Sequence, residues 1–265
     1  MTAQPDSAVQ PVVLRRDEDG VSTLTLNRPQ QFNALNGAML TELKASLEAI
    51  ARDASVRVVV LAGAGRAFCP GHDLKEMLSH STGEFIGELF RLCCDVMLSI
   101  RRLPQPAIAK VHGIATAAGC QLVAACDLAV AAQDARFATS GINFGLFCAT
   151  PGVPVSRNVS QKRAFEMLMT GAFIDAPTAL GWGLLNRVVP PGELDGAVAE
   201  LARQLKEKPR AVVAAGKHFF YRQLEERLEE AYRDASAVIT DNMLSPDGQE
   251  GVGAFVEKRK PRWRE

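Results

Sequence analysis

The sequence lacks the features that mark several large classes of protein. No apolar run reaches the roughly 20 residues of a membrane-spanning helix, so we expect no contact with membranes. Lys plus Arg and Asp plus Glu each number 30, and the resulting zero net charge gives no general attraction to nucleic acid. The opening residues have no basic start followed by an apolar block, which predicts no signal peptide and a disordered lead over 1–11.

Motifs for metals, cofactors and catalytic nucleophiles are also missing. The six cysteines form no C-x-x-C pair, and the four histidines lie far apart without carboxylates or cysteines at ligand intervals, so we predict no metal site. No glycine-rich dinucleotide or P-loop motif occurs, and no G-x-S-x-G nucleophile motif, so we predict no bound cofactor. Cysteines set in apolar segments are typical of reduced, buried thiols, from which we predict a cytoplasmic protein.

What the chain does contain is a regular alternation of buried strands and amphipathic helices. Strand patterns occupy 21–27, 56–63, 106–113, 126–132, 135–140 and 186–190. Helices are predicted over 37–52 (with Asn36 as N-cap), 83–102, 156–170 and 177–182, and then over 193–207, 210–231, 234–243 and 247–259. The pattern predicts an α/β core over 12–190 and an all-helical region over 191–265, divided at Pro190-Pro191-Gly192.

Two turns of small residues each follow an apolar strand and precede a helix, at 71–73 (G-H-D) and 117–119 (A-A-G). The free N–H groups at such a helix start favour negative charge. Two such turns on one sheet can point N–H groups at one carbonyl oxygen, as an enolate or acyl-transfer intermediate requires. On the pattern alone, tight packing of helix on strand is the commoner explanation.

Few side chains at these turns carry obvious chemistry. His72 lies between Gly71 and Asp73, where exposure in a cleft and a simple polar loop residue are both open interpretations. Asp73 precedes a helical run and is explained by an N-cap. Gln121, in the helix expected to begin near Ala118, is a neutral amide, so this turn has no acid or base.

Four ordered stretches resemble the enoyl-CoA hydratase/isomerase (crotonase) family. They cover 27–36 (N-R-P-x-x-x-N-A-L-N), 66–74 (R-A-F-C-x-G-H-D-L), 106–127 (P-A-I-A-x-V-H-G to C-D) and 251–263 (G-x-x-A-F-x-E-K-R-K-P-x-W). The match runs from about Val21 to Trp263. A further stretch, G-L-F-C-x-T-P-G-V at 145–153, is shared with one subgroup of that family.

The resemblance implies a fold, a ligand and an assembly. The fold would be a spiral of ββα turns, whose C-terminal helices build a homotrimer or a dimer of trimers. The ligand would be an acyl-CoA thioester whose carbonyl accepts hydrogen bonds from the backbone N–H groups of His72 and Ala118. The resemblance also implies CoA-binding positions at Asn33, Ala34, Leu35, His72, Asp73, Leu74 and Lys75, with Phe255 and Lys258 reaching the nucleotide end, commonly from a neighbouring subunit.

The chain departs from the family where hydration chemistry is done. Hydratases of the family use two glutamates, and the matching positions here hold Gln121 and Gly141. Glutamine exchanges no proton near neutral pH, and glycine has no side chain. General acid–base catalysis contributes about 10²–10⁴-fold, so losing both groups predicts very low activity on crotonyl-CoA.

Three functions are consistent with these residues. The first is an acyl-CoA enzyme of lyase or isomerase type that relies on the oxyanion hole, for example a malonyl-type decarboxylase with His72 near the substrate carboxylate and Thr139 or Ser140 nearby. The second is a catalytically weak protein that binds acyl-CoA or a partner. The third is a thioester hydrolase whose water is held by His72 or Gln121, with Cys148 as nucleophile in a remote variant.

Overall fold

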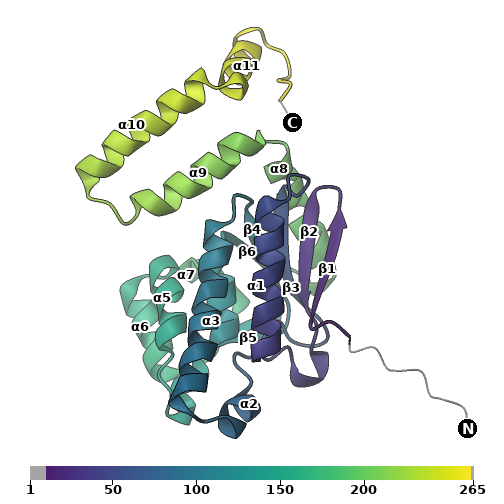
Figure 1. Ribbon diagram of the computed structural model, residues 1–265, viewed down its shortest axis with the longest axis vertical. Helices are drawn as coiled ribbons and strands as arrows, with labels where there is room; N and C mark the ends of the chain where they lie inside the picture. The colour runs from purple at the N-terminus through teal and green to yellow at the C-terminus, as the bar shows by residue number, and fades with distance from the viewer. Residues whose placement is uncertain (1–9, 264–265) are drawn as a thin grey trace, which may run out of the picture.

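The structure is a computed structural model that describes residues 10–263, so the predicted lead over 1–11 lies almost wholly outside the described residues. Its main sheet has six strands (Figure 1). β1 pairs antiparallel with β2, and all other neighbours are parallel. In spatial order the strands are β1 (Val13–Glu18), β2 (Val21–Leu26), β3 (Val58–Gly63), β4 (Ala107–Val111), β6 (Leu128–Ala132) and β9 (Arg187–Val189).

The fold also contains a second, smaller sheet of three strands. It contains β5 (Ile114–Thr116), β7 (Arg136–Ala138) and β8 (Ile174–Asp175). The chain passes from β4 to β5 and into α4 (Ala118–Ala125), then from β6 to β7 and into the helices η2 (Ser140–Phe144) and α5 (Ala149–Asn158). This repetition of large-sheet strand, small-sheet strand and helix confirms the predicted α/β spiral of ββα turns.

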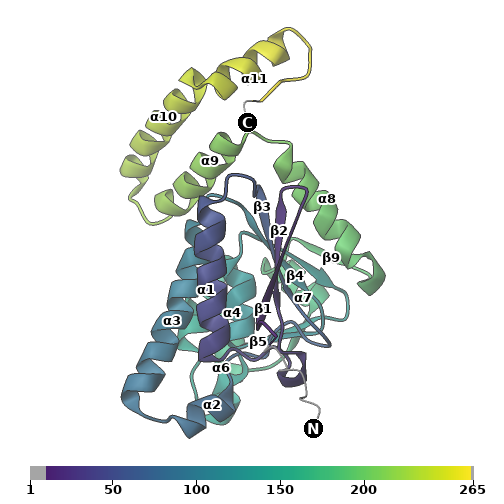
Figure 2. The same ribbon diagram turned by 45° about the vertical axis from the view of Figure 1, so that its right-hand side comes forward.

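Helices cover both faces of the main sheet. The inward side chains of α1 (Gly37–Arg52), α3 (Gly83–Arg102) and α4 form one cluster with Val59 and Leu61 of β3. Val58 and Val60, which point to the other face, pack with α8 (Leu194–Lys206). Figure 2 shows α8 on the side of the sheet opposite α1 and α3. The apolar run of β3 is therefore explained by burial on both faces.

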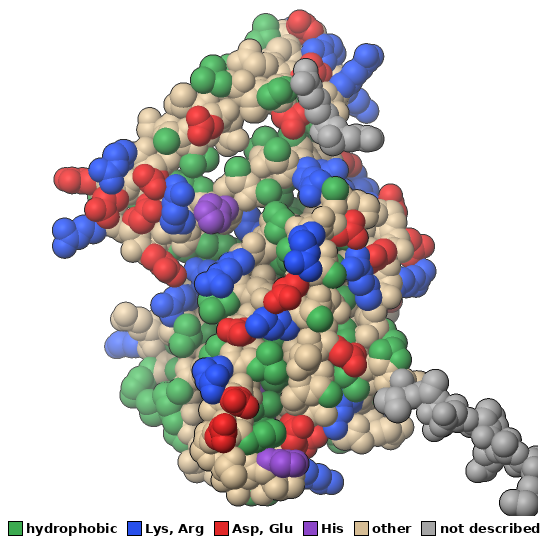
Figure 3. Space-filling model, in the orientation of Figure 1, with side chains coloured by type: hydrophobic (Ala, Val, Ile, Leu, Met, Phe, Trp, Pro, Cys, Tyr) green, Lys and Arg blue, Asp and Glu red, His purple; other side chains and the backbone are tan. Residues whose placement is uncertain are grey.

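Three C-terminal helices extend beyond the sheet: α9 (Arg210–Gln223), α10 (Leu228–Leu244) and α11 (Pro246–Val256) (Figure 1). An ion pair ties α9 to the core, because Lys217 Nζ lies 2.7 Å from Asp127 Oδ2 and the Tyr221 hydroxyl donates to Asp127 Oδ1 at 2.7 Å. Figure 3 shows hydrophobic side chains on the outer surface of this region. The exposed hydrophobic residues of these helices and of the turn after α9 are Phe220, Leu224, Leu228, Tyr232, Ile239, Met243, Leu244, Val252, Phe255 and Val256.

The sequence patterns placed several boundaries wrongly. The single helix expected over 156–170 is two, α5 and α6 (Gln161–Thr170), since the chain is extended at Val159 and Ser160. The helix expected over 210–231 ends at Gln223, and α10 begins at Leu228. Helix α7 (Ala176–Trp182) lies close to where it was expected. Other short elements have too few residues or too little periodicity to be predicted fully, namely β1, β5, β8, α2 (Leu74–Ser79), η1 (Pro29–Gln31) and η3 (Pro191–Glu193). The division at residue 190 stays a prediction.

Candidate functional site

The turn at Gly71-His72-Asp73 lies between the loop before α1 and the strand β5. Isolated bridges pair Leu35 with His72 on one side and Cys69 with Ala115 on the other. Gly71 has a φ of +107°, a left-handed conformation that glycine adopts without a Cβ clash, and it turns the chain between the two bridges.

Two backbone N–H groups at this junction have no acceptor within residues 10–263. The Leu35 N–H donates to the Gly71 carbonyl at 2.8 Å, and the Asp73 N–H donates to the Leu35 carbonyl at 2.9 Å, so the N–H of His72 points away from Leu35. Ala118 is the first residue of α4, where an N–H has no intrahelical partner. Within residues 10–263, neither N–H donates a hydrogen bond.

The two turns are in direct contact. A Cβ built on Gly71 would lie 3.0 Å from the Ala117 Cβ and 3.3 Å from the Ala118 nitrogen. A Cβ on Gly119 would lie 2.0 Å from the Cys69 carbonyl oxygen, so only glycine allows α4 to come this close. Ala117, before α4, is held at φ 49° and ψ −121°, which costs about 1–3 kcal/mol for a residue with a side chain. Such strain is typical of functional sites.

Two buried polar side chains beside these turns have no hydrogen-bond partner in the described part of the chain. Both ring nitrogens of His72 are inaccessible and unpaired, as is Oε1 of Gln121, whose residue is only 2% exposed. Burial lowers the pKa of His72 to about 4, and the backbone of Leu35 opposes that shift to a smaller extent. The imidazole is therefore neutral at physiological pH, and its edge meets Phe90 with ring centroids 5.0 Å apart.

The space around Gly141, which the resemblance matches to the second glutamate of the hydratases, is filled by other atoms. A Cβ on Gly141 would lie 2.5 Å from the Leu146 carbonyl oxygen and 2.8 Å from the Cys148 sulfur. The Gly141 N–H also donates to that sulfur at 3.3 Å. Burial raises the pKa of the Cys148 thiol, which makes it a poor nucleophile. The chain has therefore no room at residue 141 for any side chain without a local shift.

Asp73 and Asn33 shape the site from within. Asp73 caps α2 by accepting from the Lys75 N–H at 3.1 Å, and its Oδ2 pairs with Arg28 at 3.0 Å. Burial alone would raise the pKa of Asp73, but the ion pair and the amides lower it. Asn33 is fully buried, and its amide donates to the carbonyls of Ala64 and Ala67 at 2.8 Å. The side chain of Asn33 is thus engaged within the protein.

Sequence reasoning missed Arg28, although it lies in the N-R-P stretch. Its guanidinium donates to the Ala34 carbonyl at 2.7 Å as well as to Asp73. It therefore joins the two loops that carry most of the predicted CoA-binding residues.

The remaining predicted positions are spread over the molecule. Ala34 and Leu35 are buried in the loop before α1, whereas Leu74 and Lys75 are exposed on α2. Phe255 is 85% exposed on α11, and Lys258 is exposed just beyond it. Figure 1 shows α11 and α2 at opposite ends of the molecule. Phe255 and Lys258 therefore lie far from the turn at 71–73 of their own chain.

The two hydroxyls that the sequence analysis named have different partners. Thr139 bonds within the protein core, and Ser140 bonds next to the turn at 117–119. The Thr139 hydroxyl donates to the Met167 carbonyl at 2.7 Å and is fully buried. The Ser140 hydroxyl lies 2.7 Å from that of Thr116, the last residue of β5 before the strained Ala117. The Thr116–Ser140 pair thus links the turn before α4 to Gly141.

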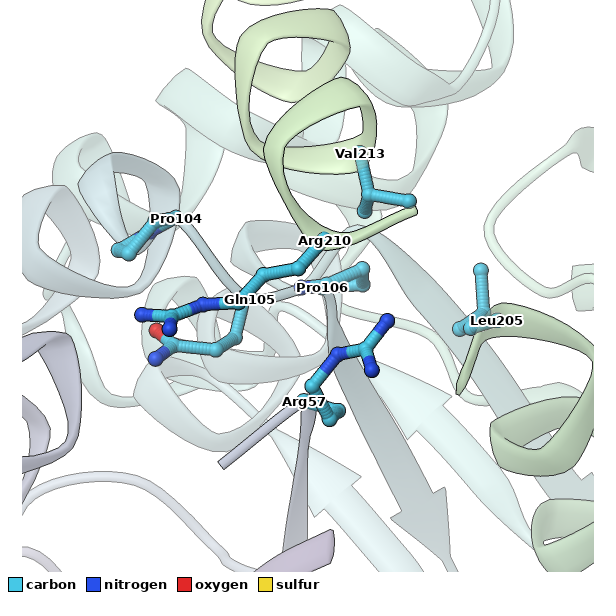
Figure 4. A pocket seen from close by; sticks show the side chains of 7 residues that line it. All are labelled: Arg57, Pro104, Gln105, Pro106, Leu205, Arg210 and Val213. Carbon is cyan, nitrogen blue, oxygen red and sulfur yellow. The ribbon is translucent and has the colours of Figure 1, made fainter. Parts of the chain in front are cut away.

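A small cavity lies at the opposite edge of the sheet, where β3 and β4 begin. Arg57, Gln105 and Arg210 are among the side chains that line it, beneath the start of α9 (Figure 4). Ligands of parallel sheets bind at the carboxyl ends of strands, which does not favour this cavity. In residues 10–263 no three His, Cys, Asp or Glu side chains cluster as a metal site would require, and no helix is long and apolar enough to cross a membrane.

Comparisons with known proteins agree with the resemblance in the sequence. Residues 16–265 match the family model described as enoyl-CoA hydratase/isomerase. Human enoyl-CoA hydratase domain-containing protein 3, mitochondrial, is 45% identical over 94% of this chain and 82% of the relative, which confirms the subgroup indicated by 145–153.

Solved structures agree in fold. One described as enoyl-CoA hydratase from Mycobacterium smegmatis superposes with a TM-score of 0.94 at 59% identity, covering 96% of this chain and 99% of the other. Human enoyl coenzyme A hydratase domain-containing protein 3 superposes with a TM-score of 0.93 at 44% identity, covering 95% and 100%. These neighbours confirm the crotonase-like fold.

The relatives also correct one prediction and establish the family. We expected a cytoplasmic protein, but the relatives of this subgroup from five vertebrates all carry the word mitochondrial in their names, and the cytoplasmic prediction is wrong by that comparison. Its basis was too weak, because buried thiols do not identify a compartment. The family match spans nearly the whole sequence, and the chain therefore belongs to the enoyl-CoA hydratase/isomerase family.

Proposed function

We propose that this chain binds an acyl-CoA thioester whose carbonyl oxygen accepts hydrogen bonds from the His72 and Ala118 N–H groups. The observation that carries the proposal is the contact between the two turns, each of which has an N–H without an acceptor. Such preorganised donors act on charge that develops on the oxygen, and each is worth about 3 kcal/mol of barrier.

The reaction that this site supports best forms an enolate without a protein base. In decarboxylation of a malonyl-type CoA, the bond between the α-carbon and the carboxylate breaks and its electron pair moves to the thioester oxygen, releasing CO₂. A proton from water then gives the shorter acyl-CoA. Gln121 and Gly141 supply no proton transfer, and this reaction requires none from them.

Hydration is not supported by the same residues. The position of one family glutamate is a buried amide, and the space of the other is taken by the Cys148 sulfur and the Leu146 carbonyl. Losing two proton-transfer groups, each worth about 10²–10⁴-fold, predicts hydration far slower than in a two-glutamate hydratase.

A product survey separates these functions. The chain is incubated with crotonyl-CoA and with methylmalonyl-CoA, and the thioesters are followed by mass spectrometry. We expect propionyl-CoA from the second substrate and almost no 3-hydroxybutyryl-CoA from the first. Turnover of crotonyl-CoA at the rate of a two-glutamate hydratase would overturn the proposal, and release of free CoA would instead identify a thioester hydrolase. Saturable binding with no product would identify a protein that only binds acyl-CoA.

We also propose that the C-terminal helices assemble the chain into a homotrimer or a dimer of trimers. Their exposed hydrophobic side chains support it, since only Ala231 of α10 is buried in the single chain. In such an assembly Phe255 and Lys258 would reach the nucleotide end of CoA held by a neighbouring copy. An ammonium group beside a phosphate is physically favourable.

A further inference from the structure

Gln121 is a buried amide that its own protein leaves unused. Within residues 10–263 its Oε1 is inaccessible and unpaired, and its amide nitrogen donates no hydrogen bond. Buried polar groups are normally paired, because an unpaired one loses its hydration without compensation. An unpaired buried amide destabilises the folded protein unless a bound ligand supplies its missing hydrogen bonds.

The amide lies over the first turn of α4. Helical side chains lean toward the N-terminal end of their helix, and residues three apart share a face. The backbone N–H of Gln121 donates to the Ala117 carbonyl at 3.0 Å, which places Gln121 in the first turn of α4. We therefore expect its side chain to lean toward the helix end that carries the Ala118 N–H. The backbone of the neighbouring turn reaches the same end, because a Cβ built on Gly71 would lie 3.3 Å from the Ala118 nitrogen.

The charges near this end favour an anion in the acyl group. A carboxylate at residue 121 or 141 would repel a second carboxylate on a bound ligand, and this chain has neither. The one acid in the adjacent turn, Asp73, is neutralised by Arg28 at 3.0 Å and by the amides that it caps. The amide nitrogen of Gln121 is a donor of the kind that a carboxylate accepts.

We infer that Gln121 is a specificity-determining residue that selects acyl-CoA thioesters carrying a second carboxylate on the acyl group. The inference rests on the proposed function, because it takes the thioester to lie on the His72 and Ala118 N–H groups. A hydroxyl substituent is the competing occupant, since it would pair with Oε1. The charge of residue 121 favours the carboxylate over the hydroxyl. A glutamine in place of a glutamate removes the electrostatic repulsion of a carboxylate on the acyl group, whereas a neutral hydroxyl on the acyl group would gain no comparable affinity.

The test compares thioesters of equal chain length by calorimetry. Succinyl-CoA and butyryl-CoA form one pair, glutaryl-CoA and pentanoyl-CoA the second, and 3-hydroxybutyryl-CoA is the neutral polar probe. For the wild-type chain we expect at least one dicarboxylic thioester to bind ten-fold or more tightly than its partner. In Gln121→Glu that preference is lost or reversed, because the affinity for the dicarboxylic thioesters falls more than the affinity for butyryl-CoA and pentanoyl-CoA. Gln121→Met, which has similar size and no donor, abolishes the preference as well.

Thermal unfolding of Gln121→Met separates recognition from a structural role. Because Gln121 has no partner in the described chain, we expect an unchanged or raised Tm. A lowered Tm, equal affinities within both pairs, or preference for 3-hydroxybutyryl-CoA would each overturn the inference. The proposed function fails in a different way, if no thioester binds better than free CoA.

Discussion

His72 enters the site through its backbone, yet its side chain is what makes the site sensitive to acid. The pKa of its imidazole is lowered by burial to about 4, against about 6.5 in an unfolded chain. Between these values the unfolded state binds more protons than the folded state. Protonation of His72 thus favours unfolding in this pH range. The full contribution of His72 to the unfolding free energy is present only above a pH of about 6.5.

The first prediction follows from that difference. As pH falls from about 6.5 to about 4, His72 should remove up to about 1.4 kcal/mol of unfolding free energy per pH unit. The measurement is urea unfolding of the wild type and His72→Gln across this range. The wild type should lose stability more steeply than the variant, and His80→Gln, on the exposed end of α2, is the control. Parallel pH profiles for the wild type and His72→Gln would contradict the burial that we describe.

At residue 141 the structure explains what the sequence could only note. The sequence predicts that a glutamate is missing, but the contacts of Leu146 and Cys148 come from a loop that folds back onto η2. A loop of this kind has no periodicity from which its path could be predicted. The packing around Gly141 therefore leads us to expect that a single substitution would not supply a working glutamate there.

The second prediction concerns Gly141→Glu. Overpacking a closed site typically costs about 1–3 kcal/mol, and we expect a loss of that size in urea unfolding, with no gain in crotonyl-CoA hydration. Gly83→Ala, at a glycine with open space around it, is the control and should be near neutral. A stable variant with restored hydration would show that residue 141 alone limits the chemistry.

At the scale of elements, the close approach of α4 to the turn at 71–73 is the feature on which the site depends. Sequence patterns predicted both turns and the start of α4 near Ala118. They did not predict their contact, because β5 has three residues and the strand around Cys69 makes only isolated bridges. Glycines at 71 and 119 were the available signal, since each marks a place where backbone approaches backbone.

The third prediction tests that approach. Gly119→Ala would place a methyl group against the Cys69 carbonyl, where the Cβ position is only 2.0 Å from the oxygen. We expect a loss of about 3 kcal/mol or more in unfolding free energy, at the upper end for overpacking, and weaker acyl-CoA binding because the two N–H groups separate. Gly196→Ala, at a helical glycine of α8 with open surroundings, should be neutral or stabilising and bind normally. Equal stability of Gly119→Ala and the wild type would refute the described packing.

At the scale of the whole molecule, the C-terminal helices are the part least explained by the single chain. Their exposed hydrophobic side chains exceed what isolated surface residues usually show, and such patches mark interaction sites. The sequence predicted these helices and, through the resemblance, their role in assembly. The length of each helix was less accurate, because amphipathic patterns run on through the turn at 224–227.

The fourth prediction is the mass in solution. Sedimentation should give three or six times the mass of one chain, and Ile239→Glu on α10, a residue 64% exposed in the single chain, should shift the distribution toward monomer by placing a charge in the interface. Glu230→Gln on the same helix is the control. A monomer at micromolar concentration in the wild type would contradict the assembly that we propose.

The most direct test of the central claim is the infrared band of a bound thioester carbonyl. Propionyl-CoA labelled with ¹³C at that carbonyl is bound to saturation, and the labelled band is isolated by difference from the unlabelled complex. Two N–H donors from His72 and Ala118 polarise the bond, so we predict a band at lower frequency than in water, and a smaller shift in Gly119→Ala. A bound carbonyl with the same frequency as in solution would contradict the account.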